Sequence, residues 1–102
     1  MKAFLQHVLL AACAMVFAQA QAADVAAGTA KAEEVCADCH GDDGKGDDES
    51  PDIVKLTEKE FLQAMEEYRS GARTKNAKMA RAAKRLTADE IANLAAYYET
   101  LK

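Results

Sequence analysis

The sequence has 102 residues, with 13 basic and 17 acidic side chains and a formal net charge of -4. This length fits one domain and excludes a large hydrophobic core, because a short chain buries only a modest fraction of its surface. It contains no tryptophan and three cysteines. In an oxidising compartment such cysteines can form a disulfide, bind a metal or carry a covalent cofactor.

Residues 1–22 have the pattern of a secretory signal peptide. A positively charged start precedes an apolar stretch over residues 3–17, and small residues follow up to Ala23. We expect cleavage near residues 20–23, which would leave residues 23–102 as the exported, periplasmic domain.

Two other readings would keep the N-terminus at the membrane. A membrane anchor would need roughly 20 apolar residues, and the apolar stretch is shorter than that. A lipoprotein would need a cysteine at the cleavage site, but Cys13 lies inside the apolar stretch. We therefore expect no stable membrane insertion after cleavage.

The next segments predict a helix followed by a loop. Residues 25–35 are rich in Ala, Lys and Glu, and they predict a first helix that runs directly into a cysteine motif. Residues 41–50 contain three glycines and five acidic residues, which predicts a flexible, solvated loop. This loop lacks the alternating ligand spacing and the closing glutamate of an EF-hand, so we do not expect it to bind calcium.

Two capping boxes mark the starts of two further helices. Thr57–Glu60 precedes an apolar run at helical spacing and predicts a helix to about Arg69, ended by Ser70-Gly71. Thr87–Glu90 predicts the last helix. Residues 73–86 are basic with weaker periodicity, so we expect a less regular segment there.

The sequence shows no strand pattern, and the predicted fold is all-α. The expected apolar faces are Phe61, Leu62, Met65 and Tyr68 in one helix, and Ile91, Leu94, Ala95, Tyr98 and Leu101 in the other, with Tyr97 on its flank.

The cysteine motif, Cys36-Ala37-Asp38-Cys39-His40, has the C-x-x-C-H spacing of c-type haem attachment. Two thiols three residues apart can each add to a vinyl group of the porphyrin, and the adjacent His40 can ligate the iron. A redox dithiol and a zinc site are the alternatives. The first would need a preceding strand in a βαβ unit, and the second would need further ligands. We therefore predict one covalently bound haem c with its iron.

Two methionines remain to supply a second axial ligand after signal cleavage. Met65 falls on the apolar face of a helix, where core packing explains it. Met79 stands between Lys78 and Arg81 in the less regular basic segment, and we predict it as the ligand. His/Met ligation favours reduced iron and suits electron transfer. An open or displaceable sixth position would instead indicate a ligand-binding or sensor haem protein, and that alternative stays open.

The cysteine motif, the downstream Met79 and the terminal helix occur in the order found in small bacterial class I cytochromes c, which the sequence resembles across essentially the whole exported domain. The resemblance implies three to five helices around one haem, with the N- and C-terminal helices crossing. Ser50–Ile53, Tyr68–Gly71 and Met79–Lys84 look most like the cytochrome subunits of flavocytochrome c sulfide dehydrogenases and their diffusible relatives.

This resemblance implies roles for single residues. Cys36 and Cys39 would form the thioethers, His40 the proximal bond and Met79 the distal bond. Pro51 would accept a hydrogen bond from the proximal histidine through its carbonyl, which fixes the orientation of the ring.

The resemblance also places Gly28 at the helix crossing, where Leu94 and Tyr97 would approach closely. Ala32 departs from the aromatic residue that the family usually has four residues before the first cysteine. This departure suggests a thinner contact between the helices.

Charge is distributed unevenly along the chain. Residues 33–67 carry thirteen acidic and three basic side chains, whereas residues 69–85 carry seven basic and no acidic ones. A solvated surface is one reading. The other is a basic rim on the Met79 side of the haem, which would steer an acidic partner or hold the haem propionates. Nucleic-acid binding is not expected of an exported haem protein.

The predicted function is electron transfer rather than enzymatic catalysis. The protein would act as a diffusible carrier or as the haem subunit of a dehydrogenase, such as a sulfide-oxidising flavocytochrome. Its redox partner would be a flavoprotein dehydrogenase or a terminal oxidase or reductase.

Overall fold

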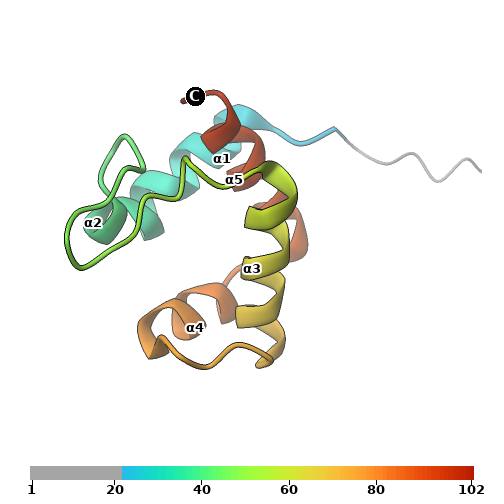
Figure 1. Cartoon of the computed structure of the whole chain (residues 1–102). Helices are drawn as coiled ribbons and strands as arrows, with labels where there is room; N and C mark the ends of the chain where they lie inside the picture. Colours follow the sequence, from blue (N-terminus) through green and yellow to red (C-terminus); the bar gives the residue numbers. More distant parts are fainter. Residues whose placement is uncertain (1–21) are drawn as a thin grey trace, which may run out of the picture.

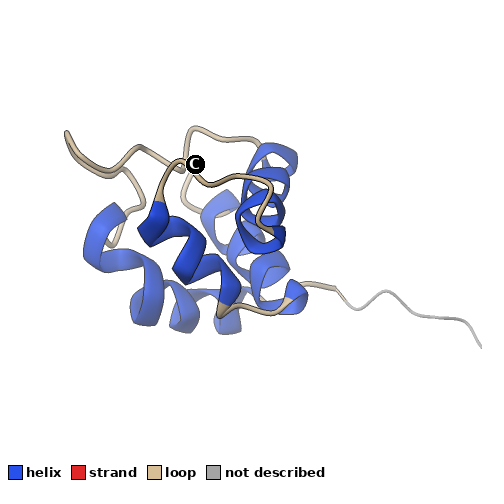
Figure 2. Ribbon diagram, turned by 90° about the horizontal axis from the view of Figure 1, so that it is seen from below, coloured by secondary structure: helices blue, strands red, loops and turns tan. Residues whose placement is uncertain are grey.

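The computed structural model describes residues 22–102, and this part of the chain is all-α (Figures 1 and 2). The predicted signal peptide falls almost entirely on residues 1–21 and lies outside the described residues. Within residues 22–102, no helix combines the length and apolar character needed to span a bilayer. The elements are α1 (Val25–Lys31), the π-helix η2 (Ala32–Cys36), α2 (Ala37–His40), α3 (Glu58–Ser70), α4 (Ala77–Lys84) and α5 (Ala88–Glu99).

The first helix forms as predicted and runs through the cysteine motif. Asp24 caps α1, accepting a hydrogen bond from the Ala27 backbone N–H at 3.0 Å. The helical path then continues through η2 and α2 to His40, where Gly41 ends it at φ 80°. The π-helical turn in the middle was not predicted. Such turns occur often at functional sites, and this one carries Cys36 at its end.

Both capping boxes form as predicted. In α3 the Thr57 hydroxyl accepts from the Glu60 N–H at 3.0 Å, and the Glu60 carboxylate accepts from the Thr57 N–H at 2.9 Å. The box at the start of α5 has the same reciprocal bonds. Gly71 ends α3 with the left-handed backbone that glycine adopts easily, at φ 90°.

The expectation of a less regular segment over residues 73–86 was wrong in part, because this segment contains α4. Asn76 caps the helix, and its side-chain oxygen accepts from the Met79 N–H at 3.1 Å. The inner side of this segment consists mainly of alanine, with Ala83 and Leu86 buried. Alanine adds little to a hydrophobic period, so the basic residues dominated the pattern.

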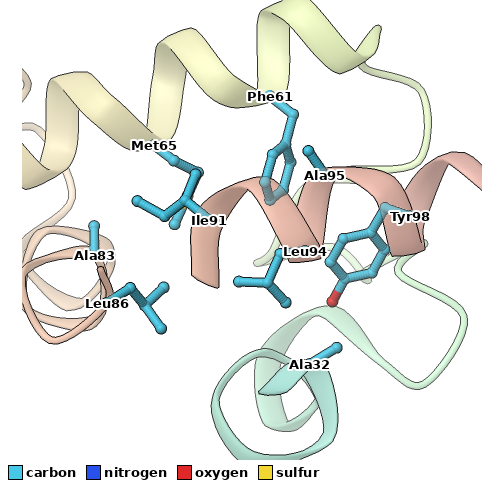
Figure 3. Packing of buried hydrophobic residues seen from close by; sticks show 9 residues of the cluster. All are labelled: Ala32, Phe61, Met65, Ala83, Leu86, Ile91, Leu94, Ala95 and Tyr98. Atoms are coloured by element: carbon cyan, nitrogen blue, oxygen red, sulfur yellow. The ribbon is translucent and has the colours of Figure 1, made fainter. Parts of the chain in front are cut away.

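The core is built around α5, which lies between α1 and α3 (Figure 3). Four residues of its predicted apolar face are buried, namely Ile91, Leu94, Ala95 and Tyr98, and Leu94 is completely inaccessible. The fifth, Leu101, follows the end of α5 and is half-buried. Met65 lies in this core as expected, at 5 % exposure, which accounts for it by packing. The buried apolar residues are Ala32, Phe61, Met65, Ala83, Leu86, Ile91, Leu94, Ala95 and Tyr98.

The crossing of α1 and α5 depends on Gly28. A Cβ atom at this position would lie 2.1 Å from the Asn93 carbonyl oxygen and 3.0 Å from the Tyr97 Cβ. The crossing agrees with the expectation from the resemblance, but the closest backbone is that of Asn93 rather than Leu94.

Candidate haem-binding site

The cysteine motif places both thiols on adjacent helical turns. Cys36 ends η2 and is half-buried, whereas Cys39 lies in α2 and is exposed. Residues three apart on a helix share one face, so the two thiols can reach the same planar group. Both cysteines are free. The burial of Cys36 raises the pKa of its thiol.

His40 is buried, with 5 % of its surface exposed, and its ring is held by one hydrogen bond. The bond joins His40 Nδ1 to the Pro51 carbonyl oxygen at 2.9 Å. A carbonyl can only accept, so Nδ1 carries the proton and Nε2 keeps its lone pair for a metal. The structure therefore contains the His40–Pro51 hydrogen bond that the resemblance implied, and the roles of both residues toward iron stay predictions.

Gly46 brings Pro51 to the histidine, a role that its place in the loop sequence does not reveal. Its N–H donates to the His40 carbonyl at 2.7 Å. Its backbone has φ 70°, and a Cβ atom there would lie 2.0 Å from the Ser50 carbonyl oxygen. The Asp47 carboxylate accepts from two backbone N–H groups in the same turn, which lowers its pKa. The loop over residues 41–50 is therefore solvated, as expected, but it is shaped by specific hydrogen bonds rather than free of structure.

Met79 occupies the first turn of α4 rather than a loop. It is half-buried and packs against the edge of the core. In Figure 1, α2 and α4 lie at the upper and lower ends of the same side of the molecule.

A hollow of about 400 Å³ joins these two regions, and we call it the α2–α4 hollow. One wall comes from α1, η2 and α2, and the other from α4 and the residues directly after it. Asp38, between the two cysteines, belongs to the first wall. The lining residues are Lys31, Glu34, Val35, Asp38, Lys78, Arg81, Ala82, Arg85 and Leu86.

The seven basic residues of the segment 69–85 divide into groups. Arg69 pairs with Glu66 at 3.2 Å, and Arg73 bonds to Glu67 through Nε at 3.0 Å, so these two cations belong to the α3 surface. Three others, Lys78, Arg81 and Arg85, line the α2–α4 hollow. A basic rim beside the cysteine motif therefore involves part of the segment and not all of it.

Tyr98 brings an unpartnered polar atom to this site. The side chain is 3 % exposed, and among the described residues its hydroxyl has no hydrogen-bond partner. Burial raises the pKa of the Tyr98 phenol, and the neighbouring Cys36 thiol raises it further. From the sequence, Tyr98 was expected to be a packing or haem-edge group, and no pattern indicated the unpartnered hydroxyl.

The residues present fit a covalently bound haem. Two free thiols lie one helical turn apart, and a buried imidazole keeps one nitrogen for the iron. Met79 on α4 offers a thioether sulfur of the kind that haem iron accepts. Within residues 22–102, the buried Tyr98 hydroxyl lacks the partner that such groups normally have.

Comparison with known proteins agrees with this fit. Residues 25–102 match the family model described as Cytochrome c. Among curated proteins, none matches the chain significantly.

Proposed function

Because the chain belongs to the cytochrome c family, and so binds haem c covalently and transfers electrons, we propose a specific set of haem-holding residues and an exported site of action. Cys36 and Cys39 form the thioethers, and His40 and Met79 ligate the iron. The protein passes single electrons in the periplasm, as a diffusible carrier or as the haem subunit of a dehydrogenase such as a sulfide-oxidising flavocytochrome.

The observation that carries this proposal is the hydrogen bond from His40 Nδ1 to the Pro51 carbonyl. A bond from one ring nitrogen fixes the tautomer and orientation of a ligating histidine and raises its basicity. His40 is also buried, so the ring has little freedom to turn away. These properties suit a permanent axial ligand rather than a surface histidine.

Each of the two proposed iron ligands, His40 and Met79, has one task in this mechanism. Bound haem iron supplies the one-electron redox couple. His40 donates from Nδ1 to the Pro51 carbonyl, so Nε2 keeps the lone pair that would bind the iron. The thioether sulfur of Met79 favours the reduced iron and raises the reduction potential.

A Cys36→Ala, Cys39→Ala double variant tests the attachment. We expect the unaltered protein to give a haem stain on a denaturing gel, because thioethers survive denaturation, and we expect the double variant to give none. Cys13→Ser is the matched control, because this cysteine lies in the expected signal peptide, and it should stain normally. Staining of the periplasmic fraction tests the export. Haem stain retained by the double variant, or a stained protein confined to the cytoplasm, would contradict the corresponding part of the proposal.

The basic rim of the α2–α4 hollow suggests how a partner docks. Lys78 and Arg81 are exposed on α4 and line the hollow. Positive charge around an electron-exchange site attracts an acidic partner and speeds the encounter. We propose that the redox partner, a flavoprotein dehydrogenase or a terminal oxidase or reductase, presents an acidic surface to this rim.

Reversing both charges, in Lys78→Glu with Arg81→Glu, should therefore slow electron exchange with anionic reagents. With ferricyanide as oxidant at low salt, we expect the second-order rate constant to fall about tenfold. The difference should shrink as salt screens the charges, and a cationic cobalt complex should react faster than before.

Lys59→Glu, on the exposed surface of α3, is the control for this charge reversal, and it should change these rates much less. Equal slowing by the control would show that overall charge acts and not this rim. Rates that do not depend on salt would remove the steering proposal.

A further inference from the structure

The Tyr98 ring is fixed in the core by its neighbours. Its centroid lies 5.8 Å from that of Phe61 and 5.1 Å from that of Tyr97. On another side it lies against the backbone of Gly44, where an added Cβ atom would come within 2.8 Å of the ring. The ring therefore cannot swing its hydroxyl out to solvent without disturbing the core.

The hydroxyl of this fixed ring is directed toward the helical segment that ends in the cysteine motif. Figure 3 shows the hydroxyl beside Leu94, directed toward the helical segment that carries Ala32. Cys36 lies on the same helical path and packs against the core. The two groups are close enough to affect each other: burial raises the pKa of the Cys36 thiol, and the Tyr98 hydroxyl opposes part of this effect. Among the described residues, however, no partner meets the distance and angle of a hydrogen bond to this hydroxyl.

A buried hydroxyl without a partner is costly, because it has lost its bonds to water. Chemistry at Cys36 can supply the partner. A free thiol carries its own proton and is both a weak donor and a weak acceptor. A thioether sulfur has no proton, so toward a neighbouring hydroxyl it can act only as an acceptor.

We propose that the Tyr98 hydroxyl donates a hydrogen bond to the haem-bonded sulfur of Cys36 and thereby raises the reduction potential of the protein. This inference depends on the attachment of haem at Cys36, which is proposed above. Tyr98 acts through the Cys36 sulfur and does not contact the iron, so it is a positioning residue.

The sign follows from the charge of the two redox states. The oxidised site carries one more positive charge than the reduced site. A hydroxyl that points its hydrogen at the haem edge brings partial positive charge there, in a buried setting where electrostatic effects are strong. The oxidised state is therefore disfavoured, and hydrogen bonds to sulfur are among the means by which proteins set such potentials.

Tyr98→Phe in the haem-containing protein tests the proposal, because it removes the hydroxyl and keeps the ring. We expect a lower reduction potential, equivalent to a fall of about twofold or more in the equilibrium constant for reduction, the lower end of what one neutral hydrogen bond supplies. Tyr97→Phe is the matched control: it removes the hydroxyl of the adjacent, less buried tyrosine and should leave the potential unchanged. The midpoint of denaturant unfolding should fall for Tyr98→Phe.

The reduction potential decides the outcome. A potential for Tyr98→Phe equal to that of the unaltered protein would overturn the proposal, as would an equal shift in both variants. A less stable Tyr98→Phe with an unchanged potential would overturn it too, because the acceptor would then lie away from the haem. Haem staining of the unaltered protein separates these results from a failure of attachment: without covalent haem both proposals fall, and with it the potential tests Tyr98 alone.

Discussion

Replacing Met79 by alanine should lower the reduction potential and abolish the weak far-red absorption band that marks a methionine–iron bond in the oxidised proteins of this family. A thioether ligand favours reduced iron. Axial ligands as a group set haem potentials over a range of about 0.8 V, so the loss of this one should change the potential by on the order of 100 mV or more. Spectroelectrochemical titration of the purified protein measures both effects.

Met65→Leu is the matched control for this substitution. Met65 is buried in the core at 5 % exposure, and leucine keeps its volume and apolar character, so the expected loss of stability is under about 1.5 kcal/mol. The far-red band and the potential should both persist. Persistence of the band in Met79→Ala would remove Met79 as the ligand. Absence of the band from the unaltered protein would favour a ligand-binding or sensor protein instead.

The helices that were predicted correctly have their signals close together in the sequence. The capping boxes at Thr57 and Thr87 each lie within four residues, and each fixes the start of a helix. The helix α4 has an N-cap at Asn76 but no capping box, and its inner face is largely alanine, so neither its start nor its apolar face stands out in the sequence. The π-helical turn before the cysteines changes the bonding partner of a few backbone groups, and no residue pattern announces that change.

The residues of the candidate site also fall into two groups, those that are neighbours in the sequence and those that are brought together by the fold. Cys36, Cys39 and His40 are contiguous, so their chemistry can be read from spacing alone. Other features depend on contacts between distant segments. The Tyr98 hydroxyl faces the segment that carries Ala32 only because α5 packs across α1. Gly46 matters only because the loop returns to place Pro51 against His40. Spacing cannot reveal such contacts, and the resemblance supplied Pro51 but neither of the other two.

Gly28→Ala should destabilise the protein strongly, although alanine is the better helix former by about 1 kcal/mol. The new Cβ atom would lie 2.1 Å from the Asn93 carbonyl oxygen, so α1 would have to move away from α5. Two contacts resist that movement. The Asp24 N–H donates to Asn93 Oδ1 at 2.8 Å near the start of α1, and Lys31 pairs with Glu90 at 3.0 Å at its end.

We expect Gly28→Ala to lower the free energy of unfolding by about 2–3 kcal/mol, the upper part of the range for overpacking. That is a large share of the total stability of a small domain. Denaturant unfolding of the haem-containing protein, followed by far-ultraviolet circular dichroism, measures the loss. Because α1 continues into the cysteine motif, the yield of haem-containing protein should also fall.

Gly71→Ala separates steric overlap from backbone strain, because it is the same substitution at a glycine with open surroundings. Apart from Gly71 and its two chain neighbours, no atom of the described residues lies within 4 Å of a Cβ built there, so its positive φ of 90° is what opposes a side chain. The cost there should be about 1–2 kcal/mol, from the left-handed backbone alone. Gly28 has no such strain, so any loss at that position measures the helix contact. A Gly28→Ala protein as stable as the unaltered one would show that α1 and α5 do not cross as closely as the structure places them, and the position of Cys36 relative to Tyr98 would then change with them.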